Sequence, residues 1–523
     1  MIPNSVVLMP SPSHCPNRFK AKRVFTDRDA PRALFKQEYA RPQTVDEYRI
    51  LNFTGIGGQG KSALCGEFEK YLSDQQTDTY HPLAWAKLNF EDSTKRQPIA
   101  ALLSLRFQLA DTGRVWFPAF DLAFSRYFAL SQAGRDLKTA HPELFKQPHD
   151  LLQAATSAIE GVSGIPLLGA LLKGGYKAKE YLRLEQWKSK RGDVLLADLE
   201  TLAPHELESK LAVYLGADIA DWLHPETDQK PRRVVLLYDT YEALWREHSL
   251  KTDLLVDKWV RQLVAETPEV LHVILGRDAL SWQTHEPQEW QGIITHETLD
   301  NLNDADAEHF LLAVPIAEAE IRARIITGAQ GIPFYLNLQV DQYESCQRQQ
   351  LTPSPDDFGG KEPEILIRFM NHLPDAMRQA LKVVSCAQWL DEALFLILSE
   401  KFLGGKAAIS FHELTVYSFW TSKNQRYYLH NVMCDYLQST YRQQEALLFQ
   451  QVHEYLFAHH DQALSALTSA RDLTDLHTEA LLQGIYHLEQ CNYQQLPYWV
   501  SKYQKLFHQA GTTPCWKAHS SKP

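Results

Sequence analysis

One short segment, residues 50–64, constrains the fold of this chain more than any other. It reads ILNFTGIGGQGKSAL: an apolar run, a glycine-rich loop with the spacing GxxxxGK(S/T), and the start of a helix. The glycines let backbone N–H groups turn inward toward phosphate oxygens, which a Cβ would obstruct. A chance match is expected in about one or two of a hundred chains of this length, and the strand and helix on either side make chance a poorer explanation. The segment therefore predicts a site for the phosphates of a nucleoside triphosphate.

Single positions of this loop have separate expected roles. Lys61 can reach the β- and γ-phosphates, and the Ser62 hydroxyl can ligate Mg²⁺. The helix that opens at Lys61 adds the positive end of its dipole. The residues predicted to bind nucleotide here are Gly55, Ile56, Gly57, Gly58, Gln59, Gly60, Lys61, Ser62 and Ala63.

The size and composition of the chain indicate several globular domains. At 523 residues it is too long for one core, and its 44% hydrophobic and 11% aromatic content is that of an ordinary globular protein. The formal net charge of −11 argues against a general nucleic-acid or anionic-membrane surface, although a local basic patch is compatible with it. Seven scattered cysteines without a CxxC pair are typical of a reducing, cytoplasmic setting.

No segment is long enough to predict a membrane span. The first 16 residues lack a charged start followed by an apolar core, so no secretory signal is predicted. The most apolar tract, residues 165–172, is eight residues long, whereas a span needs about 20. We expect this tract to pack inside a helix interface, with contact to a membrane surface as the alternative.

Apolar runs that alternate with helical patterns predict an α/β domain followed by helical regions. Residues 83–90, 233–239 and 270–277 are almost wholly apolar, as in parallel strands that helices cover on both faces. After about residue 298 such runs largely disappear, and only residues 427–429 read as a short strand. The predicted fold class is thus an α/β P-loop NTPase, with a parallel sheet and helices on both faces, followed by mainly helical domains.

A phosphate loop needs a partner acid at the end of a neighbouring strand to hold Mg²⁺ through its water shell. Asp239 ends an apolar run and fits this role, with helix capping as the alternative. Glu242 could orient and deprotonate the attacking water, although the sequence DTYE also resembles a capping box. Arg277 ends the next strand, where its guanidinium could contact a γ-phosphate or instead pair with Asp278 or another acid.

The order of these motifs resembles that of the STAND class of signal-transducing P-loop ATPases, which includes the NB-ARC and NACHT switches. The resemblance covers about residues 23–445. Residues 24–29 are similar to the family's F-x-G-R-E stretch, which implies adenine contact by Arg28, with Asp27 in place of the glycine and Asp29 in place of the glutamate. The loop itself resembles the family form G-x-G-G-x-G-K-(S/T).

Motifs further along the chain extend the resemblance. Residues 239–242 are similar to the magnesium acid and catalytic acid, and Arg277 resembles the sensor arginine. Gly-Ile-Pro, ending at Pro333, is similar to a G-x-P motif whose proline packs on adenine. Leu-His-Asn around His430 resembles the M-H-D of a winged-helix domain, whose histidine contacts the β-phosphate of ADP. Asn431 replaces the family aspartate, which implies a weaker ADP-locked state.

The resemblance also implies how the domains follow one another. We predict a flexible arm at 1–22, a P-loop nucleotide-binding domain at 23–300 with a helical insertion at about 100–225, a helical domain at 301–362, a winged-helix domain at 363–445, and a helical, tetratricopeptide-like region at 446–523.

The function that the resemblance implies is a nucleotide-controlled switch. ADP would hold a closed state through Lys61, Arg277 and His430, and ATP with Mg²⁺ at Ser62 and Asp239 would favour an open state that can self-assemble. Slow hydrolysis, with Glu242, Lys61 and Arg277 as catalytic residues, would reset it. Such a switch needs a protein trigger or effector partner, and defence against phage and transcriptional control are both common among bacterial relatives.

Two other functions stay open on the sequence. One is an AAA+ ATPase whose winged helix grips DNA, although the predicted winged helix is not rich in Lys and Arg and the net charge is −11. The other is a scaffold with a decayed ATPase site. The intact residues Lys61, Ser62, Asp239 and Glu242 argue against that interpretation.

Overall fold

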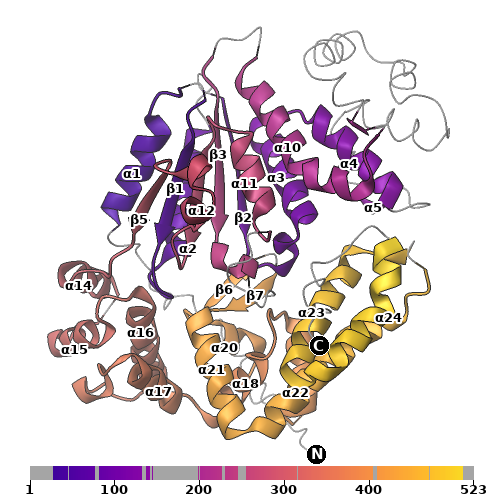
Figure 1. The fold of residues 1–523 in the computed structure, drawn as a ribbon. Helices are drawn as coiled ribbons and strands as arrows, with labels where there is room; N and C mark the ends of the chain where they lie inside the picture. Colours follow the sequence, from indigo (N-terminus) through magenta and orange to yellow (C-terminus); the bar gives the residue numbers. More distant parts are fainter. Residues whose placement is uncertain are drawn as a thin grey trace, which may run out of the picture. The chain divides into compact units, whose positions relative to one another are not determined.

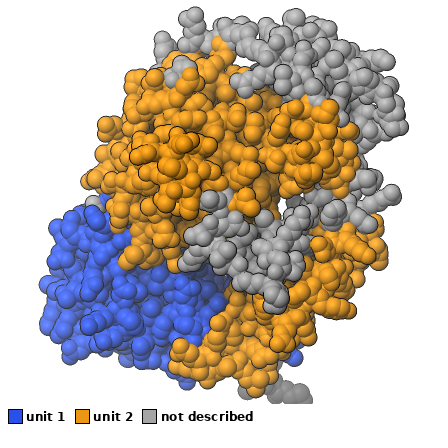
Figure 2. Space-filling view, viewed as in Figure 1, with its two compact units in different colours: residues 1–28, 58–60, 300–440 blue, residues 29–57, 61–299, 441–523 orange. Residues whose placement is uncertain are grey.

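The chain forms two compact units in a computed structural model (Figures 1 and 2). Unit 1 comprises Met1–Arg28, Gly58–Gly60 and Asp300–Thr440, and unit 2 comprises Asp29–Gly57, Lys61–Leu299 and Tyr441–Pro523. The structure describes residues 28–44, 46–76, 82–131, 137–141, 144, 198–199, 201–225, 230–245, 255–314, 316–404, 409–423, 425–469 and 472–509. The predicted arm at 1–22, the motif up to Asp27 and the apolar tract at 165–172 lie outside these residues.

Five parallel strands form the sheet of unit 2, in the order β2-β3-β4-β1-β5 (Figure 1). The α/β fold class is confirmed, and the apolar runs of the sequence are strands. The edge strand β5 was not predicted, because its residues are mostly exposed and polar and therefore form no apolar run. The strands are β1 (Arg49–Thr54), β2 (Leu83–Asn89), β3 (Arg233–Asp239), β4 (Leu271–Gly276) and β5 (Ile294–Thr298).

Helices cover both faces of this sheet, which explains why the inner strands are apolar throughout (Figure 1). On one face, Leu88 and Tyr238 belong to the same hydrophobic core as buried residues of α3, α4, α10 and α11. On the other, Phe53 of β1 lies 5.4 Å from Phe68 between ring centroids, and Phe68 stacks on Phe35 at 4.1 Å. The helices are α1 (Asp29–Ala40), α2 (Lys61–Gln75), α3 (Pro98–Gly113), α4 (Pro118–Ser131), α5 (Leu137–Ala140), α10 (Pro204–Leu223), α11 (Lys258–Ala265), α12 (Trp282–His285) and α13 (Pro287–Trp290), with the 3₁₀ turns η1 (Ser93–Arg96) and η4 (Tyr241–Trp245).

Buried polar contacts join the helices of the described parts of the insertion. Arg106 of α3 donates two hydrogen bonds to the Asp121 carboxylate of α4, at 3.0 and 2.8 Å, and both side chains are buried. Asp218 of α10 accepts the backbone N–H groups of Ala119 and Phe120 at 3.1 and 2.9 Å, where α4 begins. These contacts satisfy charges and helix-end donors that burial would otherwise leave without partners.

The described residues of unit 1 form helices and one antiparallel hairpin. Its strands β6 (Trp420–Lys423) and β7 (Arg426–Leu429) pair with each other. Asp341 accepts hydrogen bonds from the Ser418 N–H and hydroxyl at 2.8 and 2.5 Å and so ties the hairpin approach to α16. The helices are α14 (Asp304–Ala313), α15 (Ala319–Ala329), α16 (Pro333–Arg348), α17 (Glu362–His372), α18 (Asp375–Val384), α19 (Glu392–Phe402), α20 (Phe411–Thr415) and α21 (Asn431–Gln444), with the turn η5 (Pro355–Asp357).

The C-terminal part of unit 2 is helical, with α22 (Ala446–Ser465), α23 (Asp475–Cys491), the turn η7 (Tyr493–Gln495) and α24 (Leu496–Gln509). Three histidines are buried between α22 and α23. His453 Nδ1 lies 2.9 Å from His487 Nδ1, and the His460 ring stacks on His487 with centroids 5.7 Å apart. Among the helices that the structure describes, none is long and apolar enough to cross a membrane.

Two glycines provide a matched test of the packing in unit 2. A Cβ on Gly113 of α3 would lie 2.2 Å from the Ala84 Cβ and 2.9 Å from its Cα, whereas a Cβ on Gly66 of α2 would meet nothing within 4 Å. We expect Gly113→Ala to lower the free energy of unfolding by about 1–3 kcal/mol through overpacking. Gly66→Ala should raise it by about 0.5–1 kcal/mol. Urea unfolding midpoints measure both, and equal midpoints for Gly113→Ala and wild type would contradict the close approach of α3 to β2.

The buried histidines predict acid sensitivity. Burial lowers the pKa of His453 and of His460 to about 3, whereas an unfolded histidine titrates near 6.5. As the pH falls below about 6.5, these histidines therefore bind protons in the unfolded chain but not in the folded chain. Each histidine should thus reduce the free energy of unfolding by about 1–2 kcal/mol at about pH 5. His453→Leu should flatten the fall in melting temperature between about pH 7 and 5. His205→Gln, at an exposed position of α10 in the same unit, is the control that should leave the slope unchanged.

Candidate functional site

The phosphate loop joins β1 to α2, as the sequence predicts for a strand–loop–helix unit. The Lys61 ammonium folds back onto the loop and donates to the carbonyl oxygens of Gly55 and Ile56 at 2.6 and 2.9 Å. Gly58 and Gly60 have φ of +88° and +85°, values that L side chains rarely adopt. Burial lowers the pKa of Lys61, and the carboxylates of Glu242 and Asp239 oppose this effect while Arg277 adds to it.

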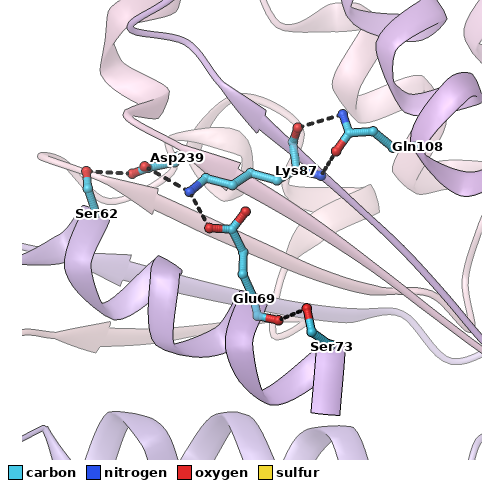
Figure 3. A network of polar contacts seen from close by, with 6 residues as sticks. All are labelled: Ser62, Glu69, Ser73, Lys87, Gln108 and Asp239. Carbon is cyan, nitrogen blue, oxygen red and sulfur yellow. Dashed lines mark hydrogen bonds and ion pairs between the residues drawn. The ribbon is translucent and has the colours of Figure 1, made fainter. Parts of the chain in front are cut away.

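The predicted magnesium ligands contact each other. The Ser62 hydroxyl donates to Asp239 Oδ1 at 3.0 Å, where α2 begins and β3 ends (Figure 3). Asp239 is 1% exposed; burial raises its pKa, and the Lys87 ammonium and the Ser62 hydroxyl oppose the rise. A hydroxyl and a carboxylate are the hard oxygen ligands that Mg²⁺ prefers. In the part of the chain that the structure describes, no cluster of three His, Cys, Asp or Glu side chains could hold a metal, so a Mg²⁺ here would take its other ligands from phosphates and water.

A lysine that sequence reasoning missed completes this side of the site. Lys87 of β2 points toward α2, where its ammonium lies 2.9 Å from Glu69 Oε2 and 3.8 Å from Asp239 Oδ2 (Figure 3). The side chain of Gln108 on α3 bonds both the N–H and the carbonyl of Lys87 at 2.9 Å and so holds this edge-strand residue in place. Burial lowers the pKa of Lys87, but the nearby acidic groups Cys65, Asp239 and Glu69 raise it by more, so Lys87 stays charged. A single lysine inside an apolar run was the available signal.

The two remaining predicted catalytic residues form an ion pair. Arg277 Nε lies 3.3 Å from Glu242 Oε1, and the Arg277 backbone N–H donates to Glu242 Oε2 at 3.2 Å. Glu242 is thus the acid that pairs with Arg277, in line with the ion-pair alternative that the sequence left open. Thr240, between β3 and the turn that carries Glu242, has φ of +57°, which is uncommon outside glycine and often marks functional turns.

In unit 1, Arg28 is bound to the middle of the phosphate loop. Its guanidinium donates to the Gln59 carbonyl at 2.9 Å and to the Asp300 carbonyl, and Arg28 is almost wholly buried. The Gln59 side chain in turn donates to Asn301 Oδ1 at 2.9 Å. Arg28, predicted from the resemblance to contact adenine, therefore also supports the backbone of the loop itself.

The predicted residues Pro333 and His430 belong to the same unit as Gly58–Gly60. The Pro333 ring lies 3.9 Å from where a Cβ of Gly60 would stand. Phe334, which was not predicted, donates its backbone N–H to the Gly58 carbonyl at 3.1 Å. Its ring stacks on the His430 imidazole, with centroids 4.4 Å apart and planes at 23°.

The predicted site residues thus fall into two groups, one in each unit. Unit 2 holds those for phosphate, metal and water: Gly55, Ile56, Gly57, Lys61, Ser62, Ala63, Asp239, Glu242 and Arg277. Unit 1 holds Arg28, Gly58, Gln59, Gly60, Pro333 and His430.

Comparisons with known proteins concern the fold. No protein-family model matches the sequence, and neither does any curated protein. Among solved structures, the chain is similar to a STAND protein with a tetratricopeptide repeat sensor from Pyrococcus horikoshii, with a TM-score of 0.45, 11% identity, and coverage of 93% of this chain and 52% of that one. It is also similar to the ORC2 protein of Aeropyrum pernix in its ADPNP–ADP complexes (TM-score 0.33, 9% identity, 81% and 96% covered). The third is the Drosophila ORC bound to DNA (TM-score 0.30, 9% identity, 84% and 96% covered).

This chain spans about half the length of the first of these proteins. Its own parallel sheet carries the glycine-rich phosphate loop between β1 and α2, in the α/β arrangement that the sequence predicts. The case for the site rests on the residues of this chain.

The contact between Lys87 and Asp239 predicts how nucleotide binding should respond to pH. Because burial raises the pKa of Asp239, protons should compete with Mg²⁺ as the pH falls. Lys87→Met removes the nearest ammonium, so the pKa should rise further and the competition should begin at higher pH. At the acid end of this profile we expect the Mg²⁺ concentration needed for nucleotide binding to be higher in Lys87→Met than in wild type. Magnesium titrations of a fluorescent nucleotide measure this.

The control for this prediction is Lys70→Met, which removes an exposed lysine from the same helix α2. It should keep the pH profile of the wild type. A parallel profile for Lys87→Met and wild type would show that Lys87 does not influence the charge of Asp239.

Proposed function

We propose that this chain is an ATP-binding signal-transduction switch of the STAND kind that hydrolyses ATP slowly. The observation that carries the proposal is the hydrogen bond between Ser62 and Asp239. It brings a hydroxyl and a buried carboxylate together at the carboxyl edge of a parallel sheet, directly after a glycine-rich loop. That arrangement suits a nucleoside triphosphate and its Mg²⁺.

Each charged side chain of the site has a proposed role. Lys61 exchanges its contacts to the Gly55 and Ile56 carbonyls for phosphate oxygens, which the loop N–H groups also bind. Ser62 and Asp239 hold Mg²⁺, which when bound supplies positive charge to the phosphates. Glu242 orients the attacking water and accepts its proton.

The ion pair between Arg277 and Glu242 offers a physical reason for slow turnover. Both oxygens of the Glu242 carboxylate already contact Arg277, one its guanidinium and the other its backbone N–H, so fewer acceptor positions remain to orient an attacking water. A γ-phosphate is a strong partner for the guanidinium of Arg277. We infer that the γ-phosphate of ATP binds Arg277 and breaks its ion pair with Glu242, which can then orient the attacking water. ADP has no γ-phosphate and therefore leaves the ion pair in place.

In this proposal the chain cycles between an ADP-bound closed state and an ATP-bound open state. Lys61, Arg277 and His430 stabilise the former, and ATP with Mg²⁺ favours the latter, in which the protein can self-assemble. A ligand shifts such an equilibrium only by its differential affinity for the two states. A protein trigger and a protein effector are the partners that this cycle requires.

The first experiment is to denature the purified protein, identify the nucleotide released and measure the size of the native protein in solution. Stoichiometric ADP on a monomer supports the closed state of the switch. An empty site, or free ATP exchange with rapid hydrolysis that DNA stimulates, would instead favour the AAA+ ATPase whose winged helix engages DNA.

Substitutions separate binding from hydrolysis. Lys61→Ala should weaken ATP affinity about ten- to hundredfold, because it removes charge-assisted bonds to phosphate. Glu242→Gln should keep ATP affinity within about threefold and reduce hydrolysis by at least about a hundredfold. Isothermal titration and phosphate release measure the two effects. Asp278→Asn, at an exposed position beside Arg277, is the control, and unchanged ATP affinity in Lys61→Ala would contradict the proposed site.

A further inference from the structure

Phe334 contacts both the phosphate loop and the histidine that ends the hairpin of unit 1. It stands at the second position of α16, after Pro333. Its backbone N–H donates to the Gly58 carbonyl at 3.1 Å, and a Cβ on Gly58 would lie only 2.7 Å from the Phe334 Cβ. The loop and the start of α16 therefore pack so closely that a movement of one requires a movement of the other.

The Phe334 ring stacks closely on His430, with centroids 4.4 Å apart. His430 is itself held at the junction of β7 and α21. Its backbone N–H donates to the Phe419 carbonyl at 2.7 Å, and its Nδ1 accepts the Val432 N–H at 3.3 Å. An Nδ1 that accepts leaves the proton of the neutral ring on Nε2. The orientation of the imidazole is therefore set by the hairpin on one side and by Phe334 on the other.

Packing alone does not require this arrangement. Phe334 is 7% exposed, and the neighbouring Ile332 and Leu336 are buried as well, so an aliphatic side chain could fill the same core volume. What an aliphatic residue could not supply is a flat face for the imidazole, which prefers stacked or edge-on aromatic partners. The ring of Phe334 thus has a geometric role in addition to its volume.

We propose that Phe334 is a positioning residue that couples the phosphate loop to His430. This inference rests on the proposed binding of nucleotide at the loop. When Gly58 moves, the backbone of Phe334 must move with it, because the two are hydrogen-bonded. The Phe334 ring then displaces the stacked imidazole of His430 and with it the start of α21. In the reverse direction, His430 supports the loop through the same ring and slows the release of bound ADP.

The test is a double-mutant cycle on ADP release. Phe334→Leu keeps the backbone N–H and much of the volume but removes the flat face, and His430→Leu removes the imidazole. Each single variant should release a fluorescent ADP analogue about two- to tenfold faster than wild type, the range expected for loss of an aromatic stack. The double variant should be no faster than the faster single variant, because both changes break one coupling.

The control is Phe358→Leu, which truncates another buried phenylalanine of unit 1 whose ring contacts Tyr343. It should lower the melting temperature without changing ADP release. Multiplicative effects in the double variant, or a wild-type release rate in Phe334→Leu, would overturn the coupling while the proposed function stands. A wild-type protein that binds no ADP would instead contradict the proposed function, and the coupling would fall with it.

Discussion

The burial of the Asp239 carboxylate is the constraint on which the rest of the site depends. A charge at the end of an apolar strand, 1% exposed, is unfavourable unless other groups stabilise it. Ser62 supplies a hydrogen bond and Lys87 a positively charged ammonium. The helix α2, which carries Ser62, and the strand β2, which carries Lys87, must therefore hold fixed positions beside the end of β3. Gln108 fixes the backbone of Lys87 on the edge strand, so the helix α3 also contributes to the position of this charge.

Charges of opposite sign are paired throughout the described site of unit 2. Lys87 lies between Glu69 and Asp239, Arg277 pairs with Glu242, and Lys61 binds carbonyl oxygens of its own loop. A nucleotide with its Mg²⁺ would have to replace several of these contacts with stronger ones. For the proposed switch, such competition would favour regulated binding over rapid turnover, because each exchange removes part of the gain in free energy.

The sequence predicts this site best where a chemical role requires a particular residue type at a particular spacing. The position of the phosphate loop, that of Asp239 at the end of its strand and the apolar strands β1, β3 and β4 could be predicted, because a glycine-rich loop before a helix, an acid that ends an apolar run and two-sided burial each leave a pattern. The strand β5 left none, since an edge strand can be polar. Lys87 and Phe334 could not be assigned either, because their roles arise from contacts between elements distant in the sequence. Arg28 binds backbone carbonyl groups. Because every residue has such a group, the sequence does not indicate which residues Arg28 contacts.

The stack of Phe334 on His430 bears on the consequence of an uncharged Asn431 beside that histidine. In the motif that this part of the chain resembles, an aspartate follows the histidine, and an asparagine cannot supply its charge. Here the imidazole is oriented by other means: the ring of Phe334 lies against its face, and the Val432 N–H is donated to Nδ1. A neutral residue at 431 is then compatible with a well-positioned histidine, since aromatic packing and a backbone hydrogen bond both contribute to the orientation of the ring. Contact between this imidazole and a phosphate would then use the Nε2 proton of the tautomer whose Nδ1 accepts the Val432 N–H.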